Sequence, residues 1–240
     1  DIYEIYITSE YWNAFPRSPM LIDFNFMDEN YFMINNHFKC CGDNILDYND
    51  SSDEENRRYI AMNLLKEYID TNLPSSNVIV LGDLNDDLAE ESPNNVFQEI
   101  LDDSAHFRFV DLEIAQGSSS EWSYPNWPSH LDHILITDEL FDDLNNSQVQ
   151  TIKIDEYLDG GWYEYDQNIS DHRPVAVKFI FSFEQNYDLN GDGNINENDL
   201  LNLLSFIMND DEAIDTPDFN FDSVVDISDL LLFSDYLQDM

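Results

Sequence analysis

A twelve-residue pattern that occurs twice near the C-terminal end constrains the fold of this chain more than any other feature. The first copy, residues 188–199, reads DLNGDGNINEND, and the second, residues 218–229, reads DFNFDSVVDISD. Each copy leads into an apolar segment, residues 200–208 and 230–237, whose composition and spacing predict a helix. A duplicated loop–helix unit predicts a small all-α domain at residues 185–240, distinct from residues 1–184.

The spacing of oxygen-bearing side chains in both copies predicts two calcium loops. Side chains at positions 1, 3, 5 and 12, with a backbone carbonyl at position 7, match the ligands of a hard cation. An acidic, solvated loop is the alternative, and two copies in register disfavour it. Gly193 allows the sharp turn at position 6, whereas Ser223 leaves the affinity of the second loop open. The predicted ligands are Asp188, Asn190, Asp192, Asn194 and Asp199, and Asp218, Asn220, Asp222, Val224 and Asp229.

The pattern DxNxDGxINxxD, with one helix per loop and Asp in place of Glu at position 12, resembles the type I dockerin module. The resemblance implies two bound Ca²⁺ ions and docking onto a cohesin-like domain of a secreted scaffold, hence an extracellular location. Ile195 and Val225 at position 8 are expected to pair the two loops in the core. The partner-selecting positions, residues 197–198 and 227–228, do not identify a partner.

The charge of the chain bears on its substrates. Nine Lys and Arg residues stand against 51 Asp and Glu residues, which gives a net charge of −42. Hydrophobic residues make up 42% of the chain, enough to bury a core. Such a charge repels polyanions, so a nucleic-acid substrate would need bridging cations. No segment predicts a membrane span, and the chain begins at Asp1 inside a predicted strand, as a fragment would.

Residues 1–184 alternate between apolar strand patterns and helical ones. A helix is predicted over residues 53–72, where acidic residues crowd the first turn as the helix dipole favours. A weaker helix is predicted over residues 93–101. Alternation of this kind predicts a mixed α/β fold. The predicted strands are residues 31–37, 77–81, 107–112, 131–137 and 175–181.

Four polar motifs stand at the ends of these strands. They read NNHFK at residues 35–39, GDLN at 82–85, SHLDHI at 129–134 and SDHRPV at 170–175. Each motif alone is weak, but their order resembles the endonuclease/exonuclease/phosphatase superfamily. The resemblance implies a four-layered α/β/β/α sandwich that cleaves phosphoesters. The sandwich is expected to be incomplete here, because the family's early Asn and metal-binding Glu find no match.

The resemblance also implies roles for individual residues. His172 is expected to be the general base, oriented by Asp132, since a carboxylate raises the basicity of an imidazole and fixes its tautomer. His37 is expected to donate to the phosphate or the leaving oxygen. Asp83 and Asn85 are expected to position water and a phosphoryl oxygen. Asp171 is expected to join the shell of Mg²⁺ or Mn²⁺.

Other side chains near these motifs are predicted to be secondary. Lys39 and His133 are second-tier candidates, while His106 and His130 are expected to be structural or exposed. Arg173 either neutralises Asp171 or caps its strand. Two adjacent cysteines, Cys40 and Cys41, are interpreted as small buried residues of little importance for catalysis. The stretch WSYPNWP at residues 122–128 either stacks on bases or sugars or forms a rigid loop packed on itself.

Two hypotheses follow for the function. The first is a secreted, metal-dependent phosphoesterase, phosphodiesterase-like or nuclease-like, tethered through a dockerin to a cohesin-bearing scaffold. The second is a calcium-binding assembly module with a catalytically inactive hydrolase-like domain. The unmatched Glu favours the second hypothesis. The presence of His37, Asp83, Asn85, Asp132 and His172 favours the first.

Overall fold

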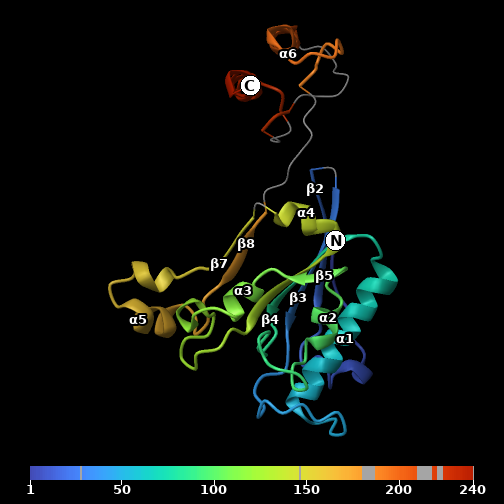
Figure 1. The fold of residues 1–240 in the computed structure, drawn as a ribbon, viewed down its shortest axis with the longest axis vertical. Helices are drawn as coiled ribbons and strands as arrows, with labels where there is room; N and C mark the ends of the chain where they lie inside the picture. The colour runs from blue at the N-terminus through green and yellow to red at the C-terminus, as the bar shows by residue number, and fades with distance from the viewer. Residues whose placement is uncertain (28, 146, 180–186, 210–217, 221–223, 240) are drawn as a thin grey trace. The chain divides into compact units, whose positions relative to one another are not determined.

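The computed structural model describes residues 1–27, 29–145, 147–179, 187–209, 218–220 and 224–239. The chain divides into two compact units, Asp1–Phe181 and Ser182–Met240 (Figure 1). The expected boundary between residues 184 and 185 lies outside the described residues. No helix among the described residues is long and apolar enough to cross a membrane.

The first unit is built on a six-stranded sheet of order β1-β2-β3-β4-β6-β5. Neighbouring strands are antiparallel except β3 and β4, which run parallel. A second, antiparallel pair joins β7 to β8. The strands are β1 (Ile2–Glu4), β2 (Met20–Phe26), β3 (Glu29–His37), β4 (Asn77–Asp83), β5 (Phe107–Phe109), β6 (Asp132–Thr137), β7 (Gln148–Thr151) and β8 (Val175–Lys178).

Helices connect and cover these strands. The long helix α1 supplies the crossover that the parallel β3–β4 pair requires. The α-helices are α1 (Glu54–Asn72), α2 (Gln98–Asp102), α3 (Leu112–Ala115), α4 (Phe141–Leu144), α5 (Gly161–Asn168), α6 (Glu197–Asn209) and α7 (Ile227–Asp239). Short 3₁₀ turns lie at η1 (Ser9–Tyr11), η2 (Ser119–Glu121), η3 (Asp138–Leu140) and η4 (Ile154–Tyr157).

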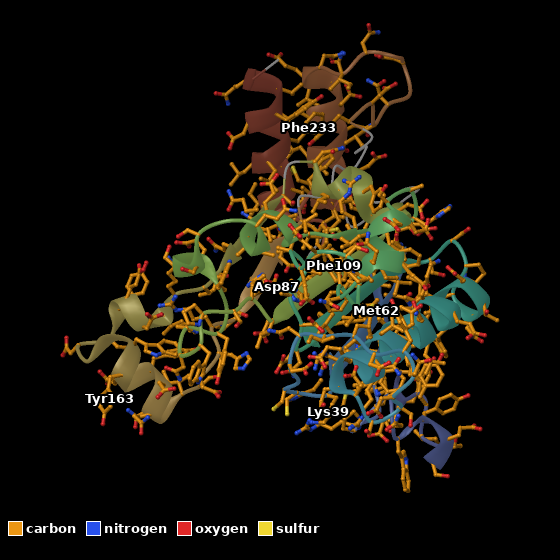
Figure 2. The ribbon with its side chains drawn as sticks, turned by 60° about the horizontal axis from the view of Figure 1, so that its bottom comes forward. Lys39, Met62, Asp87, Phe109, Tyr163 and Phe233 are labelled. Atoms are coloured by element: carbon orange, nitrogen blue, oxygen red, sulfur yellow. The ribbon has the colours of Figure 1, made fainter. Side chains whose placement is uncertain are left out.

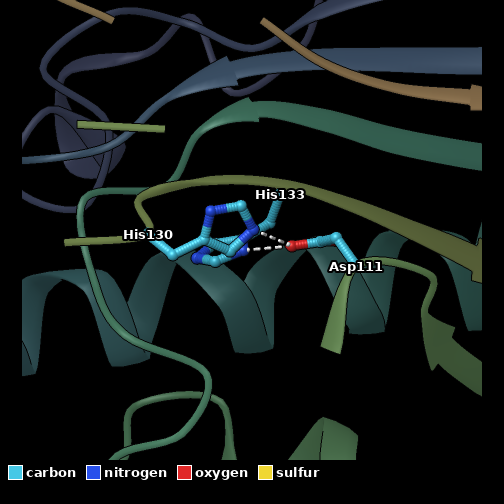
Figure 3. A group of neighbouring side chains, drawn as sticks. All are labelled: Asp111, His130 and His133. Atoms are coloured by element: carbon cyan, nitrogen blue, oxygen red, sulfur yellow. Dashed lines mark hydrogen bonds and ion pairs between the residues drawn. The ribbon is translucent and has the colours of Figure 1, made fainter. Parts of the chain in front are cut away.

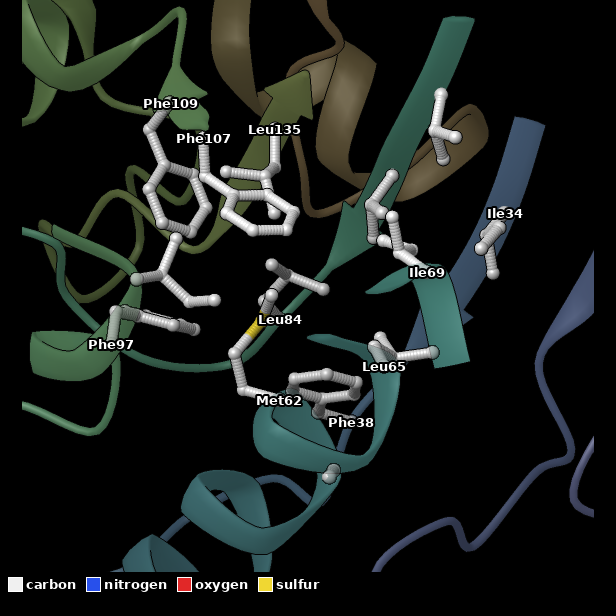
Figure 4. Packing of buried hydrophobic residues seen from close by; sticks show 14 of the residues in the cluster. Ile34, Phe38, Met62, Leu65, Ile69, Leu84, Phe97, Phe107, Phe109 and Leu135 are labelled. Carbon is white, nitrogen blue, oxygen red and sulfur yellow. The ribbon is translucent and has the colours of Figure 1, made fainter. Parts of the chain in front are cut away.

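Helix α1 begins and packs as its sequence dictates, and the prediction of a helix here is confirmed. The Asp53 side chain accepts a hydrogen bond from the amide of Asn56, which caps the first turn. Met62, Leu65 and Ile69 point into the main core, where they meet residues of β3, β4 and β6 (Figure 4). This face fixes α1 against one side of the sheet.

The central strand β4 shows why the sheet is covered on both faces. Val78 and Val80 belong to the core beneath α1. Ile79 and Leu81 point to the opposite face and pack with a second cluster that includes Val175 of β8. Because successive side chains of a strand point to opposite faces of the sheet, a continuous apolar run needs a packing layer on each face. The order is therefore helix, six-stranded sheet, second sheet. The predicted α/β class is confirmed, and the fourth layer stays a prediction.

Some elements differ from the sequence-based predictions. The helix predicted over residues 93–101 is only the short α2. The strand predicted to reach residue 112 ends at Phe109, because Asp111 turns its carboxylate inward to accept the amide of Ile134. Strand β7 and helix α5 were not predicted. Both are short, and β7 lacks the long apolar run that marked β4.

The second unit has a small aromatic core. Leu203 of α6 and Phe233 of α7 are buried with Phe219, and Ile195 and Val225 pack against the same cluster. The ring of Tyr187 stacks on that of Tyr236, with centroids 3.9 Å apart and planes 6° apart. The two helices predicted from the repeat are confirmed, and both loop residues at position 8 reach one core as expected.

Candidate active site

Strand pairing brings the ends of three predicted motifs together. His37 is the register partner of Asp83 in the β3–β4 pair, and Asp83 is the partner of Asp132 in the β4–β6 pair. Gly82 makes this close approach possible. Its φ is +132°, and a Cβ there would lie 2.0 Å from the carbonyl oxygen of Asn36.

His172 joins this group from the loop before β8. Its Nδ1 lies 2.6 Å from Oδ2 of Asp132. Two hydrogen bonds fix the backbone of His172. Its amide donates to Ser170 Oγ, and its carbonyl accepts from the Tyr165 hydroxyl. Burial alone would lower the pKa of His172, but the hydrogen bond to Asp132 and the negative charges nearby raise it. In the neutral ring Nδ1 carries the proton and Nε2 is free to accept one.

Asp83 lies between the two imidazoles without bonding either. Its Oδ2 is 3.6 Å from Nε2 of His37 and 4.0 Å from Nε2 of His172. Both distances exceed a hydrogen bond, so an atom of a bound molecule has room to bridge them. Burial raises the pKa of Asp83, and the neighbouring charge of Asp132 raises it further. This carboxyl therefore holds a proton more readily than an ordinary aspartate.

Asn85 is fixed in the turn after β4. Its φ is +57°, a left-handed conformation that Asn tolerates better than most residues. Its amide donates to Oδ1 of Asp83 at 3.0 Å, and its side-chain Nδ2 donates to the carbonyl of Phe38 at 3.3 Å. The turn thereby ties the end of β4 to the end of β3.

These residues line a single cavity of about 1150 Å³. The five predicted catalytic residues all contribute to its wall, and so does the exposed Asp171. On another side lies the aromatic loop predicted at residues 122–128. Tyr124 and Ser129 exchange two backbone hydrogen bonds, so the loop is closed on itself. The Tyr124 ring lies 4.7 Å from that of His172, and Trp127 is 76% exposed at the cavity.

A buried arginine that the sequence analysis did not single out contributes to the wall of this cavity. Arg58 of α1 is 2% exposed and donates to Oδ2 of Asp86 at 2.7 Å. It also lies 3.3 Å from the buried Glu55 and donates to the carbonyl oxygens of Lys39 and Cys41. Arg58 thus fixes the segment that leaves β3. Its position three residues after Glu55 on a helix was the available signal.

Asp111, His130 and His133 form a second buried group (Figure 3). Asp111 Oδ2 lies 2.9 Å from Nε2 of His130 and 2.6 Å from Nδ1 of His133. His133 Nε2 faces the carbonyl of Asp86, so both of its nitrogens face acceptors and its ring is protonated. His130 Nδ1 accepts from the amide of Ser123, which makes that ring a neutral donor to Asp111.

This group supports the cavity wall rather than lining it. Burial alone would raise the pKa of Asp111, but the charge of His133 and hydrogen bonds from both rings lower it. Burial would lower the pKa of His133, and the Asp111 charge raises it instead. All four ring nitrogens are committed to protein partners. The group braces Ser123, whose hydroxyl accepts from the amide of Asp132.

Several secondary predictions are corrected by the structure. Arg173 neither neutralises Asp171 nor caps a strand, because its guanidinium pairs in bidentate fashion with Asp155 at 2.9 and 2.6 Å. Cys40 and Cys41 are exposed, not buried, and both line the cavity. Cys41 adopts a positive φ of 72°, a backbone conformation that the sequence does not reveal.

Neither His106 nor Lys39 is among the residues that line the cavity. His106 is exposed, with Nδ1 2.7 Å from Asp103. Lys39 lies 3.8 Å from Glu54 and extends from the segment after β3 (Figure 2).

In the second unit the two predicted calcium loops share one hydrogen-bond pattern. Asp199 and Asp229, both at position 12, are fully buried. Each accepts the backbone amides of positions 3 and 9, from Asn190 and Asn196 in the first loop and from Asn220 and Asp226 in the second.

The other predicted ligands lie around these two aspartates. Asp188 accepts the amides of Asp192 and Gly193, and Asp192 accepts that of Asn194. Asp218 and Val224 lie in the second loop, where Val224 is 55% exposed. Asp222 falls outside the described residues. The repeat is therefore visible in the backbone as well as in the sequence.

Within the described residues, three groups of His, Asp or Glu bring ligand atoms within 4.8 Å of one another. One of these groups is Asp83, Asp132 and His172, in the cavity, and it does not include Asp171. The described aspartates of the first predicted calcium loop do not form such a group. The other two groups are Asp111, His130 and His133, and Asp43, Asp53 and Glu55.

No protein-family model matches the chain, and no curated protein matches it. Among solved structures it is similar to D. rerio TDP2 in complex with a single-strand DNA product, with a TM-score of 0.50 and 14% identity over 75% of this chain. The chain spans 66% of that TDP2 chain. The likeness shows that the fold is shared.

Two further solved structures are similar at lower scores. An endonuclease/exonuclease/phosphatase from Bacteroides vulgatus has a TM-score of 0.41 and 12% identity, covering 68% of this chain and 56% of that one. The human Nocturnin catalytic domain has a TM-score of 0.40 and 15% identity, covering 68% and 52%.

Proposed function

We propose that the first unit is a divalent-metal-dependent hydrolase of phosphoric esters. The observation that supports this most directly is the His172–Asp132 pair at 2.6 Å, facing Asp83 and His37 in one cavity. In-line attack on a phosphoester requires a base for the water and stabilisation of charge on the phosphoryl oxygens. The shared fold with TDP2 agrees with this proposal.

Each residue then has a task that its geometry suits. His172 takes the proton of the attacking water at Nε2, while Asp132 holds Nδ1–H and stabilises the imidazolium. Asp83 binds that water in the gap between the two imidazoles. His37 donates to the phosphate or the leaving oxygen, and Asn85 orients a phosphoryl oxygen.

The residues present fit a hard divalent cation. Asp83, Asp132 and Asp171 all line the cavity and offer carboxylate oxygens, and ligand atoms of Asp83, Asp132 and His172 lie within 4.8 Å of one another. Asp171 would hold Mg²⁺ or Mn²⁺, with waters completing the shell. When bound, the ion would neutralise charge on the phosphoryl oxygens.

The substrate class includes phosphodiesters of nucleic acids as well as smaller esters. TDP2 was crystallised with a single-strand DNA product, and the exposed Trp127 offers a face on which a base or sugar can stack. The charge of −42 makes binding of a polyanion dependent on cations.

We further propose that the second unit is a dockerin-like module that binds two Ca²⁺ ions and docks onto a cohesin-like domain of an extracellular scaffold. The repeated pattern at Asp199 and Asp229 supports this, because a fully buried carboxylate closes each loop in the same way. The alternative function keeps this calcium-binding module and takes the hydrolase-like unit to be inactive.

A phosphoesterase assay on the chain separates these functions. Substrates should include a chromogenic phosphodiester, single-stranded DNA and a nucleotide, with Mg²⁺ or Mn²⁺ present and then chelated. The proposal expects hydrolysis that requires metal, is lost in His172→Ala and persists in the control His106→Gln. Metal-independent hydrolysis, or equal rates in both variants, would contradict it. No turnover together with calcium-dependent cohesin binding would favour the alternative.

A further inference from the structure

Two exposed thiols meet on the wall of the cavity. Neighbouring residues of an extended strand point to opposite sides, so adjacent cysteines ordinarily keep their sulfur atoms apart. Here Cys41 has a φ of 72°, and its Sγ lies 3.1 Å from Sγ of Cys40. Both residues line the cavity that contains His37 and His172.

Contacts with the buried residues Arg58 and Glu55 fix this arrangement. The guanidinium of Arg58 donates to the carbonyl of Lys39 at 2.9 Å and to that of Cys41 at 2.6 Å, on either side of Cys40. Arg58 is itself fixed by Asp86. Gly42 follows with a φ of +119°, and a Cβ there would lie 2.0 Å from Oε1 of the buried Glu55. The cysteine pair is therefore built into the fold.

The surroundings of the two sulfur atoms differ. Sγ of Cys40 accepts a hydrogen bond from the Cys41 thiol, and Nζ of Lys39 lies 3.7 Å away. The bond from Cys41 lowers the pKa of Cys40, and the charge of Lys39 acts in the same direction. The same shared bond raises the pKa of Cys41. Because the thiolate is the nucleophile, these contacts favour Cys40 as the attacking sulfur.

We propose that Cys40 and Cys41 form a thiol-exchange site on the cavity wall, with a low-molecular-weight disulfide as the reactant. The Cys40 thiolate attacks one sulfur of the disulfide, forms a mixed disulfide and releases one thiolate. Cys41 then loses its proton and attacks Cys40 Sγ, which releases the second thiolate and leaves a Cys40–Cys41 disulfide. Two electrons pass from the cysteine pair to the small disulfide, and the protons of the two thiols pass to the solvent.

The product is expected to be easily reversed. Adjacent Cα atoms lie about 3.8 Å apart, whereas ordinary disulfides join Cα atoms roughly 4.4–6.8 Å apart. A bridge between neighbours is therefore strained, and strained disulfides are the labile ones. An adduct on Cys40 would also occupy the cavity next to His37. This effect on catalysis rests on the proposed function, whereas the exchange chemistry does not.

The aromatic disulfide 5,5′-dithiobis(2-nitrobenzoate) is a suitable probe, because each exchange releases a coloured thiolate. The folded wild-type chain should release two equivalents and end lighter by two hydrogen atoms, with no adduct. Cys41→Ser should release one equivalent and keep the adduct on Cys40. Cys40→Ser should react about tenfold or more slowly, and Lys39→Met should slow Cys40.

The outcomes that overturn the proposal are distinct. If Cys40→Ser and Cys41→Ser react at equal rates in the folded state, as both should in urea, the fold does not activate Cys40. If the wild type keeps two adducts, Cys41 does not resolve the first. Loss of phosphoesterase activity on modification, restored by dithiothreitol, would add the link to the cavity. If the chain has no phosphoesterase activity, the equivalents of thiolate released and the adducts retained still test the thiol-exchange proposal.

Discussion

Asp83 and Asp132 face each other across the β4–β6 pair, and their pKa values are shifted in opposite directions. Burial raises the pKa of both carboxyls. In Asp132 the hydrogen bond from His172 outweighs burial and lowers it. In Asp83 the charge of Asp132 adds to burial. Two equivalent side chains thus acquire different protonation behaviour, as paired acidic groups in hydrolases do.

The first prediction concerns the pH dependence of hydrolysis. The rate should rise with pH as His172 loses its proton, with a midpoint above the ordinary imidazole value of 6.5 because Asp132 raises its pKa. Asp132→Asn should move this limb to lower pH and reduce the rate. His172→Ala should lower kcat by about a hundredfold to ten-thousandfold. The measurement is kcat/KM against pH, and an unmoved midpoint in Asp132→Asn would contradict the pairing.

The second prediction concerns the metal. Asp171→Asn should lower activity at limiting Mg²⁺ and recover part of it at high Mg²⁺, because a lost ligand weakens binding of the ion rather than the chemistry. The matched control is Asp159→Asn, an exposed aspartate outside the cavity lining. Titration of Mg²⁺ against rate measures both. Identical metal dependence in the two variants would remove Asp171 from the metal shell.

The third prediction concerns the buried Asp111–His133 pair. Asp111→Asn leaves the His133 ring without its counter-charge, and loss of one partner of a buried pair typically costs about 3–5 kcal/mol. Urea unfolding followed by tryptophan fluorescence tests this, since Trp12, Trp122, Trp127 and Trp162 all lie in the first unit. The exposed control Asp138→Asn should stay close to wild type.

The same pair gives stability a defined pH dependence. The raised pKa of His133 gives a stabilisation that is complete below the unfolded imidazole value of about 6.5 and is lost as pH rises through the folded value. The lowered pKa of Asp111 gives a stabilisation that is present above about pH 3.9 and is lost as pH falls through the pKa of Asp111 in the folded state. The contribution of the pair should peak between those limits, and Asp111→Asn should flatten both flanks.

The fourth prediction concerns calcium. Addition of Ca²⁺ should slow amide hydrogen exchange across residues 187–209, because the ion offsets repulsion among the loop carboxylates. Asp188→Ala should reduce this protection, whereas Glu197→Gln, outside the ligand positions, should not. From the sequence, Ser223→Gly should strengthen calcium binding. Unchanged exchange in the wild type on adding Ca²⁺ would contradict the dockerin proposal.

The sequence predicts the local elements well where one physical signal dominates. The cap at Asp53 and the apolar face of α1 fix that helix, and the apolar run from Val78 marks a strand buried on both faces. The family resemblance carried by the four polar motifs implies that His37, Asp83, Asp132 and His172 converge, and all four line one cavity. These signals are local or are carried by the family resemblance.

The parts that escaped prediction depend on contacts distant in sequence. The bonds of Asp111 to His130 and His133 are set by the β5–β6 pairing. Arg58 reads as one of two adjacent arginines on a polar helix face, and only the fold buries it against Asp86. The exposure of Cys40 and Cys41 escaped prediction because it depends on the path of the chain after β3, where Cys41 has a positive φ.

The parallel pairing of β3 with β4 affects when the residues of the cavity can come together during folding. That pairing needs the whole α1 crossover, and long-range pairing is the slow part of folding. His172 follows Asp132 by forty residues and meets it only once the segment before β8 has reached β6. During synthesis, a chain interrupted after β6 would already contain His37, Asp83 and Asp132 but would lack His172, the proposed base. The proposed site is therefore complete only after the segment that precedes β8 has been made.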